Sequence, residues 1–174
     1  MAMDDREEQE KAADWIRSHI VDCAVAERAH RLLADKSRRY NYRLGIPIIL
    51  LTTLVGTSSF YSLADLGQTR TSIAIATGII SVLAAVLAAL QTFLHFEDDS
   101  KVHSEAATSF AGLLHTYRYL LSIPQAAIEP GRLYALDSEY SEVVSKQPPV
   151  PLAIEAEAKK AVAKEYGPDW KKYF

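Results

Sequence analysis

Three side chains that could ligate a metal ion recur at four-residue steps near the middle of the chain: His95, Asp99 and His103. On one continuous helix this spacing would bring them to one face, where imidazole and carboxylate groups can bind zinc. Nothing else in the sequence completes a four-ligand site. His95 could instead cap a membrane interface, with Asp99 and His103 on the surface or packed. We therefore predict no metal site and no cofactor.

Side chains for covalent or acid–base catalysis are also sparse. The chain has no glycine-rich phosphate loop and no nucleophile elbow. Cys23 is the single cysteine and has no activating group near it in sequence, and His115 is a lone histidine on an expected helix. We predict no catalytic residue, and that the protein is not an enzyme.

Small polar side chains interrupt two otherwise apolar stretches. Their hydroxyls could bond back to their own helix, or they could line a water-filled path in an oligomer. The second interpretation gives four candidate pore-lining residues: Thr53, Thr57, Ser81 and Gln91. No ionisable residue lies at the centre of either stretch, which argues against a proton-coupled carrier.

The two stretches, residues 44–64 and 71–96, contain no Asp, Glu, Lys or Arg, and only six residues separate them. A helix over the first would be about 32 Å long, close to the roughly 30 Å thickness of bilayer hydrocarbon. The second is longer, so it would tilt or project beyond the membrane. We predict a transmembrane helical hairpin. The alternative is a soluble protein that buries the same hairpin.

Basic residues near the expected spans predict the orientation. One, Arg70, lies in the link between the spans. By the positive-inside rule the N-terminus is cytoplasmic, and two spans return the C-terminus to the same side. We predict a multi-pass protein of the bacterial inner membrane with both termini in the cytoplasm, since five basic residues precede the first span: Arg31, Lys36, Arg38, Arg39 and Arg43.

The sequence also predicts helices in the flanking regions. Apolar residues recur at helical spacing over residues 13–43 and 97–122, and residues 152–166 are rich in Ala, Glu and Lys. The predicted organisation is a cytoplasmic N-terminal helical region, two spans, a second cytoplasmic helical region, and a Pro-rich linker with a C-terminal helix. The bounds are 1–43, 44–64, 71–96, 97–147 and 148–174.

Small residues form a seam on the expected second span, at steps of three and four. Such residues let helices approach closely in a bilayer. The seam could pack against the first span or against another copy of the chain. We predict an all-α membrane protein, a two-helix hairpin with long helical extensions in an oligomeric bundle. The seam is Ala74, Gly78, Ser81, Ala85 and Ala88.

The layout resembles the SLATT domain family of bacterial two-span effectors, over roughly residues 25–165. A basic and aromatic run, Arg38-Arg39-Tyr40-x-x-Arg43, precedes Leu44-Gly45-Ile46-Pro47 at the first span. The second span ends in Phe93-Leu94-x-Phe96 before acidic residues. His103-x-x-Ala106-Ala107 then leads into Phe110-x-x-Leu113.

The resemblance implies a pore-forming or membrane-disrupting effector of a bacterial anti-phage or conflict system. It also implies a nucleotide-synthesising or nucleotide-sensing partner protein, although the chain shows no fused sensor domain. The basic run at residues 36–40 is explained by topology and anionic lipid, so we expect no nucleic-acid partner. The alternative is a membrane-anchored scaffold that recruits a cytosolic partner through its helices.

Overall fold

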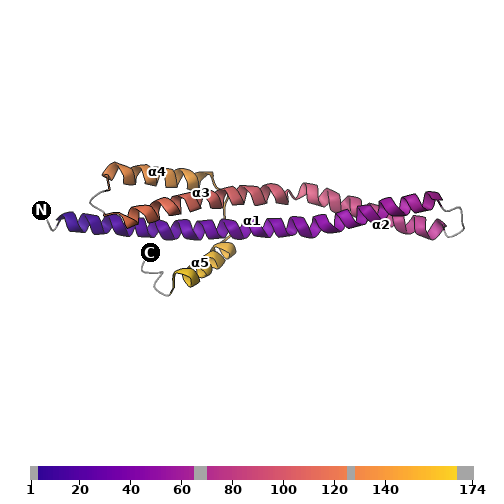
Figure 1. The fold of residues 1–174 in the computed structure, drawn as a ribbon, viewed down its shortest axis with the longest axis horizontal. Helices are drawn as coiled ribbons and strands as arrows, with labels where there is room; N and C mark the ends of the chain where they lie inside the picture. Colours follow the sequence, from indigo (N-terminus) through magenta and orange to yellow (C-terminus); the bar gives the residue numbers. More distant parts are fainter. Residues whose placement is uncertain (1–3, 65–69, 125–127, 168–174) are drawn as a thin grey trace. The chain divides into compact units, whose positions relative to one another are not determined.

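The computed structural model describes residues 4–64, 70–124 and 128–167. Every regular element in these ranges is a helix, so the all-α prediction is confirmed (Figure 1). The helices are α1 (Asp4–Ala64), α2 (Arg70–Phe93), α3 (Phe96–Ser122), α4 (Pro130–Lys146) and α5 (Leu152–Tyr166).

Helix α1 runs without a break through both the charged N-terminal region and the first uncharged stretch. Pro47 lies inside it. Proline has no amide hydrogen, so the carbonyl of Arg43, four residues earlier, receives no helical hydrogen bond. The helix nevertheless continues to Ala64.

The chain divides into two compact units. We call Met1–Asp35 with Lys101–Phe174 the core unit, and Lys36–Ser100 the apolar unit. Helices α1 and α3 each contribute residues to both units. The two units differ sharply in the burial of their apolar side chains.

The core unit is organised around the packing of α1 against α3. On α1 the buried side chains include Ile16, Ile20 and Cys23, which are spaced to lie on one face. The matching stripe on α3 includes Phe110, Leu113, Leu114, Tyr117 and Leu120. Burying a large apolar side chain contributes about 1.5–3 kcal/mol, so this interface dominates the stability of the unit.

Helices α4 and α5 lie on opposite sides of this pair within the core unit (Figure 1). Leu136 anchors α4: it is buried, and its carbonyl accepts a hydrogen bond from the Tyr117 hydroxyl at 3.4 Å. Ala158 and Val162 are the buried residues of α5. Gly167 ends α5 with a φ of 81°, a conformation that glycine adopts without strain.

The apolar unit pairs the end of α1 with α2 in antiparallel orientation. Asn41, near the start of this unit, contacts Gln91, near the end of the unit: the Gln91 amide donates a hydrogen bond to Asn41 Oδ1 at 3.0 Å. Tyr40 stacks on Phe96 with ring centroids 5.7 Å apart. Among the side chains described in this unit, only Ile48 and Ala84 are buried.

A break separates α2 from α3 although no charged residue interrupts the sequence before Glu97. Helix α2 ends at Phe93, three residues before the uncharged stretch does, and His95 has a φ of 44°. The amides of Leu94 and Asp99 still donate to Leu90 and His95. The break therefore lies where the apolar sequence meets the acidic one.

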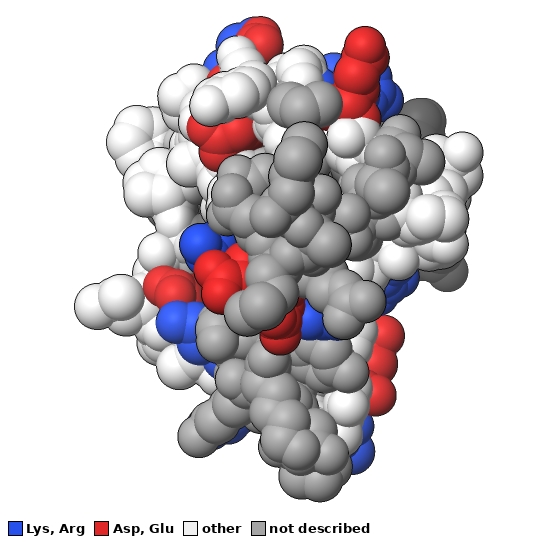
Figure 2. All heavy atoms as spheres, turned by 90° about the vertical axis from the view of Figure 1, so that its left-hand side faces the viewer, with Lys and Arg blue, Asp and Glu red and all other residues white. Residues whose placement is uncertain are grey.

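The surface of the core unit is mixed in charge. Figure 2 shows Lys and Arg close to Asp and Glu over one face of the molecule, without a large area of either sign. Arg17 contacts Asp14 at 2.7 Å and Lys159 contacts Glu155 at 2.7 Å, both along a single helix. Exposed pairs of this kind contribute about 0.2–1 kcal/mol each, so they are secondary to the α1–α3 packing.

Tyr117→Ala should destabilise the core unit strongly, because the ring is fully buried between α1, α3 and α4. Truncating a buried aromatic side chain costs about 3–5 kcal/mol. Tyr119→Ala is the matched control, since Tyr119 lies on the same helix with 61% exposure. Thermal unfolding of the detergent-solubilised protein, followed by circular dichroism, should show a large fall in Tm for Tyr117→Ala only. Equal falls would contradict the assigned core.

Candidate functional site

The candidate site is the surface of the apolar unit, where large apolar side chains are exposed. Leu50 of α1 is 65% exposed and Val82 of α2 is 64% exposed. Others on these helices are similarly exposed: Ile46, Ile49, Leu54, Ile75, Ile79, Leu83 and Val86. So many exposed large apolar side chains on two paired helices are unusual for a soluble protein and indicate contact with a membrane or another protein.

One helical stretch of the described chain, Ile75–Ser122, is long and apolar enough to cross a membrane. Only 6% of its most apolar segment is buried, whereas a core helix of a soluble protein is mostly buried. The first uncharged stretch, residues 44–64, has described side chains only as far as residue 57. Over residues 44–57 only Ile48 is buried.

The contact between α1 and α2 uses a narrow face of α2. Ala84 is buried, and the half-buried residues follow at helical steps of three, four and seven from it: Thr77, Ile80, Ser81, Leu87, Ala88 and Gln91. Facing them on α1 are Ile48 and the half-buried Asn41, Leu44 and Gly45. The other side chains described on α2, from Ile75 to Phe93, are exposed.

The predicted small-residue seam only partly coincides with this face. Ser81 and Ala88 lie on it, whereas Gly78 and Ala85 are exposed. The side chain of Ala74 lies outside the described residues. A Cβ built on Gly78 would meet no atom within 4 Å, so this position has room for another helix.

The four candidate pore-lining residues occupy two different surfaces of the unit. Thr53 and Thr57 are exposed on α1, and their hydroxyls donate to the carbonyls of Ile49, at 2.7 Å, and of Thr53. Ser81 and Gln91 are half-buried on the α2 face that contacts α1. The fold thus brings Gln91 to Asn41 and not to either threonine.

Gln91 has a structural environment that the sequence did not reveal. A Cβ added at Gly45 would lie 3.3 Å from Gln91 Nε2, so the glycine gives the amide room to reach Asn41. A bonded side-chain pair satisfies polar groups that would otherwise be costly in an apolar environment. The pair joins α2, near its C-terminal end, to the part of α1 that carries Arg38, Arg39 and Arg43.

Basic and aromatic side chains flank this pair. The Arg38 guanidinium lies 5.7 Å from the centroid of the Tyr42 ring, a cation–π distance. Tyr40 and Tyr42 are both exposed at this level of α1. Tyrosine and arginine are suited to the water–lipid boundary, because each has an apolar body and a polar tip.

The predicted spacing of His95, Asp99 and His103 does not produce a common site. The positive φ of His95 breaks the helix, and its imidazole lies 3.3 Å from Asp98. In the part of the chain that is described, no three His, Cys, Asp or Glu side chains are grouped to hold a metal ion. The helical face assumed for these residues is therefore interrupted.

His103 belongs instead to a partly buried pair in the core unit, with the buried His30. His30 Nδ1 lies 2.9 Å from His103 Nδ1, across 73 residues of sequence, and the His30 ring stacks on Phe110. One imidazole must donate and the other accept. His30 is only 3% exposed, and burial together with the nearby His103 lowers its pKa to about 4.

Cys23 is buried in the core unit, and Tyr140 is half-buried at its edge. Burial, assisted by the negative charge of Asp22, raises the pKa of the Cys23 thiol to about 12. The same causes raise the pKa of Tyr140 to about 12. A thiol with such a pKa has almost no thiolate at neutral pH and is a poor nucleophile.

The stability of the protein should fall as the pH drops from about 6.5 towards 4. His30 in the unfolded chain takes up a proton in this range, whereas the buried His30 resists it, so protons favour unfolding. The loss at pH 4.5 should be on the order of 2 kcal/mol.

His30→Phe should reduce this pH dependence, and His115→Phe, at an exposed position of α3, should leave it unchanged. Tm measured by circular dichroism at pH 7 and pH 4.5 gives the comparison. If His30→Phe keeps the full difference in Tm between pH 7 and pH 4.5, the pair of His30 and His103 does not cause the pH dependence.

Comparison with known proteins adds no relative. No protein-family model, no curated protein and no solved structure matches the chain. The geometry of the apolar unit is therefore the basis for proposing a function.

Proposed function

We propose that the chain is a two-span membrane protein whose hairpins assemble into a pore. The observation that carries this proposal is the exposure of large apolar side chains on both helices of the apolar unit, including Leu50 and Val82. A bilayer removes such surface from water, with a free energy of about 25 cal/mol for each Å². The hydrogen bonds of an α-helix satisfy its own backbone, as a membrane requires.

A single hairpin cannot enclose a path for solutes, so conduction requires several copies. Gly78 and Ala85 are exposed next to the α1–α2 contact and suit close helix packing between copies. Thr53 and Thr57 are exposed as well, and each hydroxyl oxygen can still accept a hydrogen bond from water. These two threonines are the stronger candidates for the pore wall.

The proposed orientation has both termini in the cytoplasm of a bacterial cell. Arg38, Arg39 and Arg43 precede the first span, and Arg70 is the one basic residue of the link. The cation–π contact of Arg38 with Tyr42 suits the cytoplasmic boundary of the inner membrane. The core unit would then lie in the cytoplasm.

The likeness to the SLATT family gives this pore its proposed role. It would permeabilise the inner membrane as the effector of a nucleotide-regulated anti-phage or conflict system. A nucleotide-signalling partner protein would supply the trigger. The core unit offers helices that could repack between a closed and an open state.

A membrane-anchored scaffold is the second candidate function. Tyr134 on α4 and Leu152 on α5 are 80% and 82% exposed in the core unit, and exposed apolar residues can anchor a partner. In this function the spans would serve only as an anchor, so changes to their polar residues would have no effect on activity.

Cysteine labelling in intact cells tests the two-span topology. Single cysteines replace Glu10, Gln68 or Ser141 in a Cys23→Ala background, and a membrane-impermeant maleimide is added to spheroplasts. Gln68→Cys should react from outside, whereas Glu10→Cys and Ser141→Cys should react only after lysis. Reaction of all three in intact spheroplasts, or of Gln68→Cys only after lysis, would contradict the topology.

Conductance across a planar bilayer tests the pore. The purified wild-type protein should give discrete current steps, and Thr53→Val with Thr57→Val should lower the step size several-fold by removing hydroxyls from the water-filled path. Thr108→Val is the matched control, because its hydroxyl makes the same bond to the preceding turn, to Ser104 at 3.0 Å, in the core unit.

Two results would separate the candidate functions. Unchanged conductance in the double variant would remove Thr53 and Thr57 from the pore wall. A correctly inserted oligomer that leaves the bilayer insulating, with and without its co-expressed partner, would favour the scaffold.

A further inference from the structure

A polar cavity opens between α1, α3 and α5 of the core unit. Its volume is about 420 Å³. Three of its lining side chains are arginines, two from α1 and one from α3, and His115 lies beside them. The charged and polar residues around it are Glu27, Arg28, Arg31, His115, Arg118, Glu165 and Tyr166.

A second cavity of about 250 Å³ adjoins the first and is mostly apolar. Its lining includes Ile20 and Val21 of α1, Leu121 of α3, and a fourth arginine, Arg17. Arg118, Val162 and Tyr166 line both cavities. Together the two spaces form one groove with a cationic part and an apolar part.

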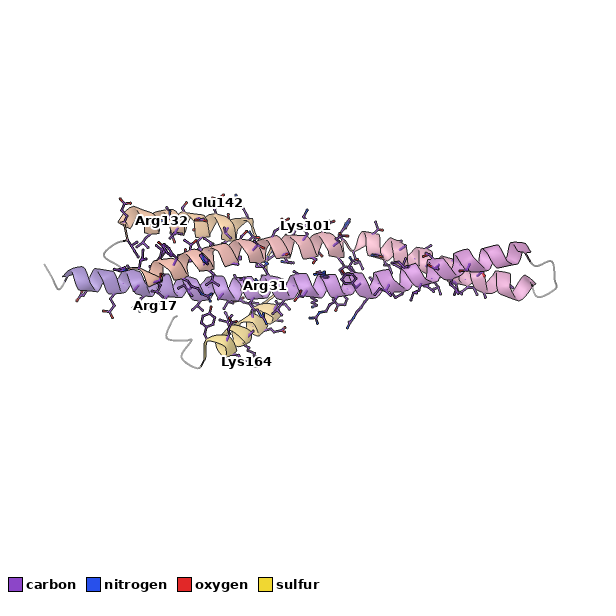
Figure 3. The ribbon with its side chains drawn as sticks, in the orientation of Figure 1. Arg17, Arg31, Lys101, Arg132, Glu142 and Lys164 are labelled. Atoms are coloured by element: carbon purple, nitrogen blue, oxygen red, sulfur yellow. The ribbon has the colours of Figure 1, made fainter. Side chains whose placement is uncertain are left out.

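The arginines outnumber the acidic groups along this groove. Glu27 contacts Arg31 at 2.6 Å, and Arg17, at the other end of the groove, contacts Asp14 (Figure 3). Arg118 donates to the Tyr166 hydroxyl, a neutral acceptor, and its guanidinium lies 5.6 Å from the Tyr166 ring. Four arginines therefore meet three carboxylates: those of Glu27 and Glu165 in the lining, and that of Asp14 on Arg17.

We propose that this groove binds an organic phosphate with an apolar body. The phosphate would lie among Arg28, Arg31 and Arg118, and the apolar body against Ile20, Leu121 and Val162. A phosphate monoester carries about −1.5 to −2 charges and three acceptor oxygens, which suits several guanidinium groups from two helices. A simple carboxylate carries one negative charge and would neutralise fewer of these guanidinium groups.

The size of the groove fits such a ligand. Sites for small organic molecules are commonly about 300–1,000 Å³ and combine apolar walls with a few polar groups. The two cavities fall in this range together. The Tyr166 ring lines both cavities and lies at a cation–π distance from the Arg118 guanidinium, so it offers a flat surface to an apolar body.

Binding would also fix α5 to the rest of the core unit. In α5 only Ala158 and Val162 are buried, so this helix is held by a small apolar contact. Tyr166 and Val162 line the groove from α5, while the arginines come from α1 and α3. A ligand in the groove therefore joins three helices.

Isothermal titration calorimetry on the detergent-solubilised full chain tests the proposal. 1-Naphthyl phosphate is the probe, 1-naphthol is its neutral analogue, and inorganic phosphate is the head group alone. The probe should bind more tightly than either. Arg28→Ala with Arg31→Ala should weaken probe binding by about tenfold or more, since charged hydrogen bonds are lost.

Arg132→Ala and Lys164→Ala are the matched controls. Both side chains are exposed on the core unit, on α4 and α5, and neither lines the groove (Figure 3). Leu121→Trp supplies a second test, because the larger side chain fills the apolar cavity. It should weaken the binding of 1-naphthyl phosphate more than the binding of inorganic phosphate. Tm of each variant shows that the fold is retained.

Competition with AMP and with dihexanoylphosphatidic acid identifies the source of the ligand as a soluble nucleotide or a lipid. Equal binding of 1-naphthol and 1-naphthyl phosphate would overturn the proposal. So would an unchanged Kd in the Arg28→Ala, Arg31→Ala variant, or the absence of any binding of the probe. None of these outcomes depends on whether the protein forms a pore.

Discussion

Tyr117 lies fully buried where α1, α3 and α4 meet, and the arrangement of the core unit depends on this packing. Its ring meets Trp15 of α1 edge-on at 5.9 Å, and its hydroxyl reaches the Leu136 carbonyl of α4. A long helix such as α1 gains little from its own hydrogen bonds in water and needs a packed face. Helix α3 supplies that face, and it leaves further surface for α4 and α5.

The same helix α1 meets a different constraint beyond Asp35. In the apolar unit its partner α2 covers only a narrow face, centred on Ile48 and Ala84. Many of the large apolar side chains described in this unit are exposed, Leu50 and Val82 among them, so packing within one chain does not account for their apolarity. An external apolar environment would account for it, and the proposed bilayer, whose hydrocarbon thickness matches the helix length, is such an environment.

The helices could be predicted from the sequence because each depends on local spacing. The apolar stripe over residues 97–122 corresponds to α3, and the Ala, Glu and Lys content of residues 152–166 corresponds to α5. The predicted helical region 97–147 holds a second helix, α4, and Pro130 occupies its first turn, where the missing amide hydrogen costs nothing.

Contacts between distant residues could not be predicted in this way. The pairing of His30 with His103 and of Asn41 with Gln91 depends on how α1 meets its neighbours, which no local pattern specifies. The spacing of His95, Asp99 and His103 assumed an unbroken helix, and the positive φ of His95 removes that assumption. Likewise, small size alone did not tell which seam residues face α1: Ser81 and Ala88 do, whereas Gly78 and Ala85 are exposed.

In the proposed two-span topology, Pro47 has a consequence for the depth at which α1 would lie in the bilayer. The Arg43 carbonyl, deprived of its helical donor, needs water or another polar group, and leaving it bare in hydrocarbon would cost several kcal/mol. This carbonyl must stay at a hydrated level of the bilayer, or be covered by a neighbouring polar side chain. In that topology the proline would limit how deeply α1 can enter the bilayer, and the hydrocarbon contact of α1 would begin after the Arg43 carbonyl.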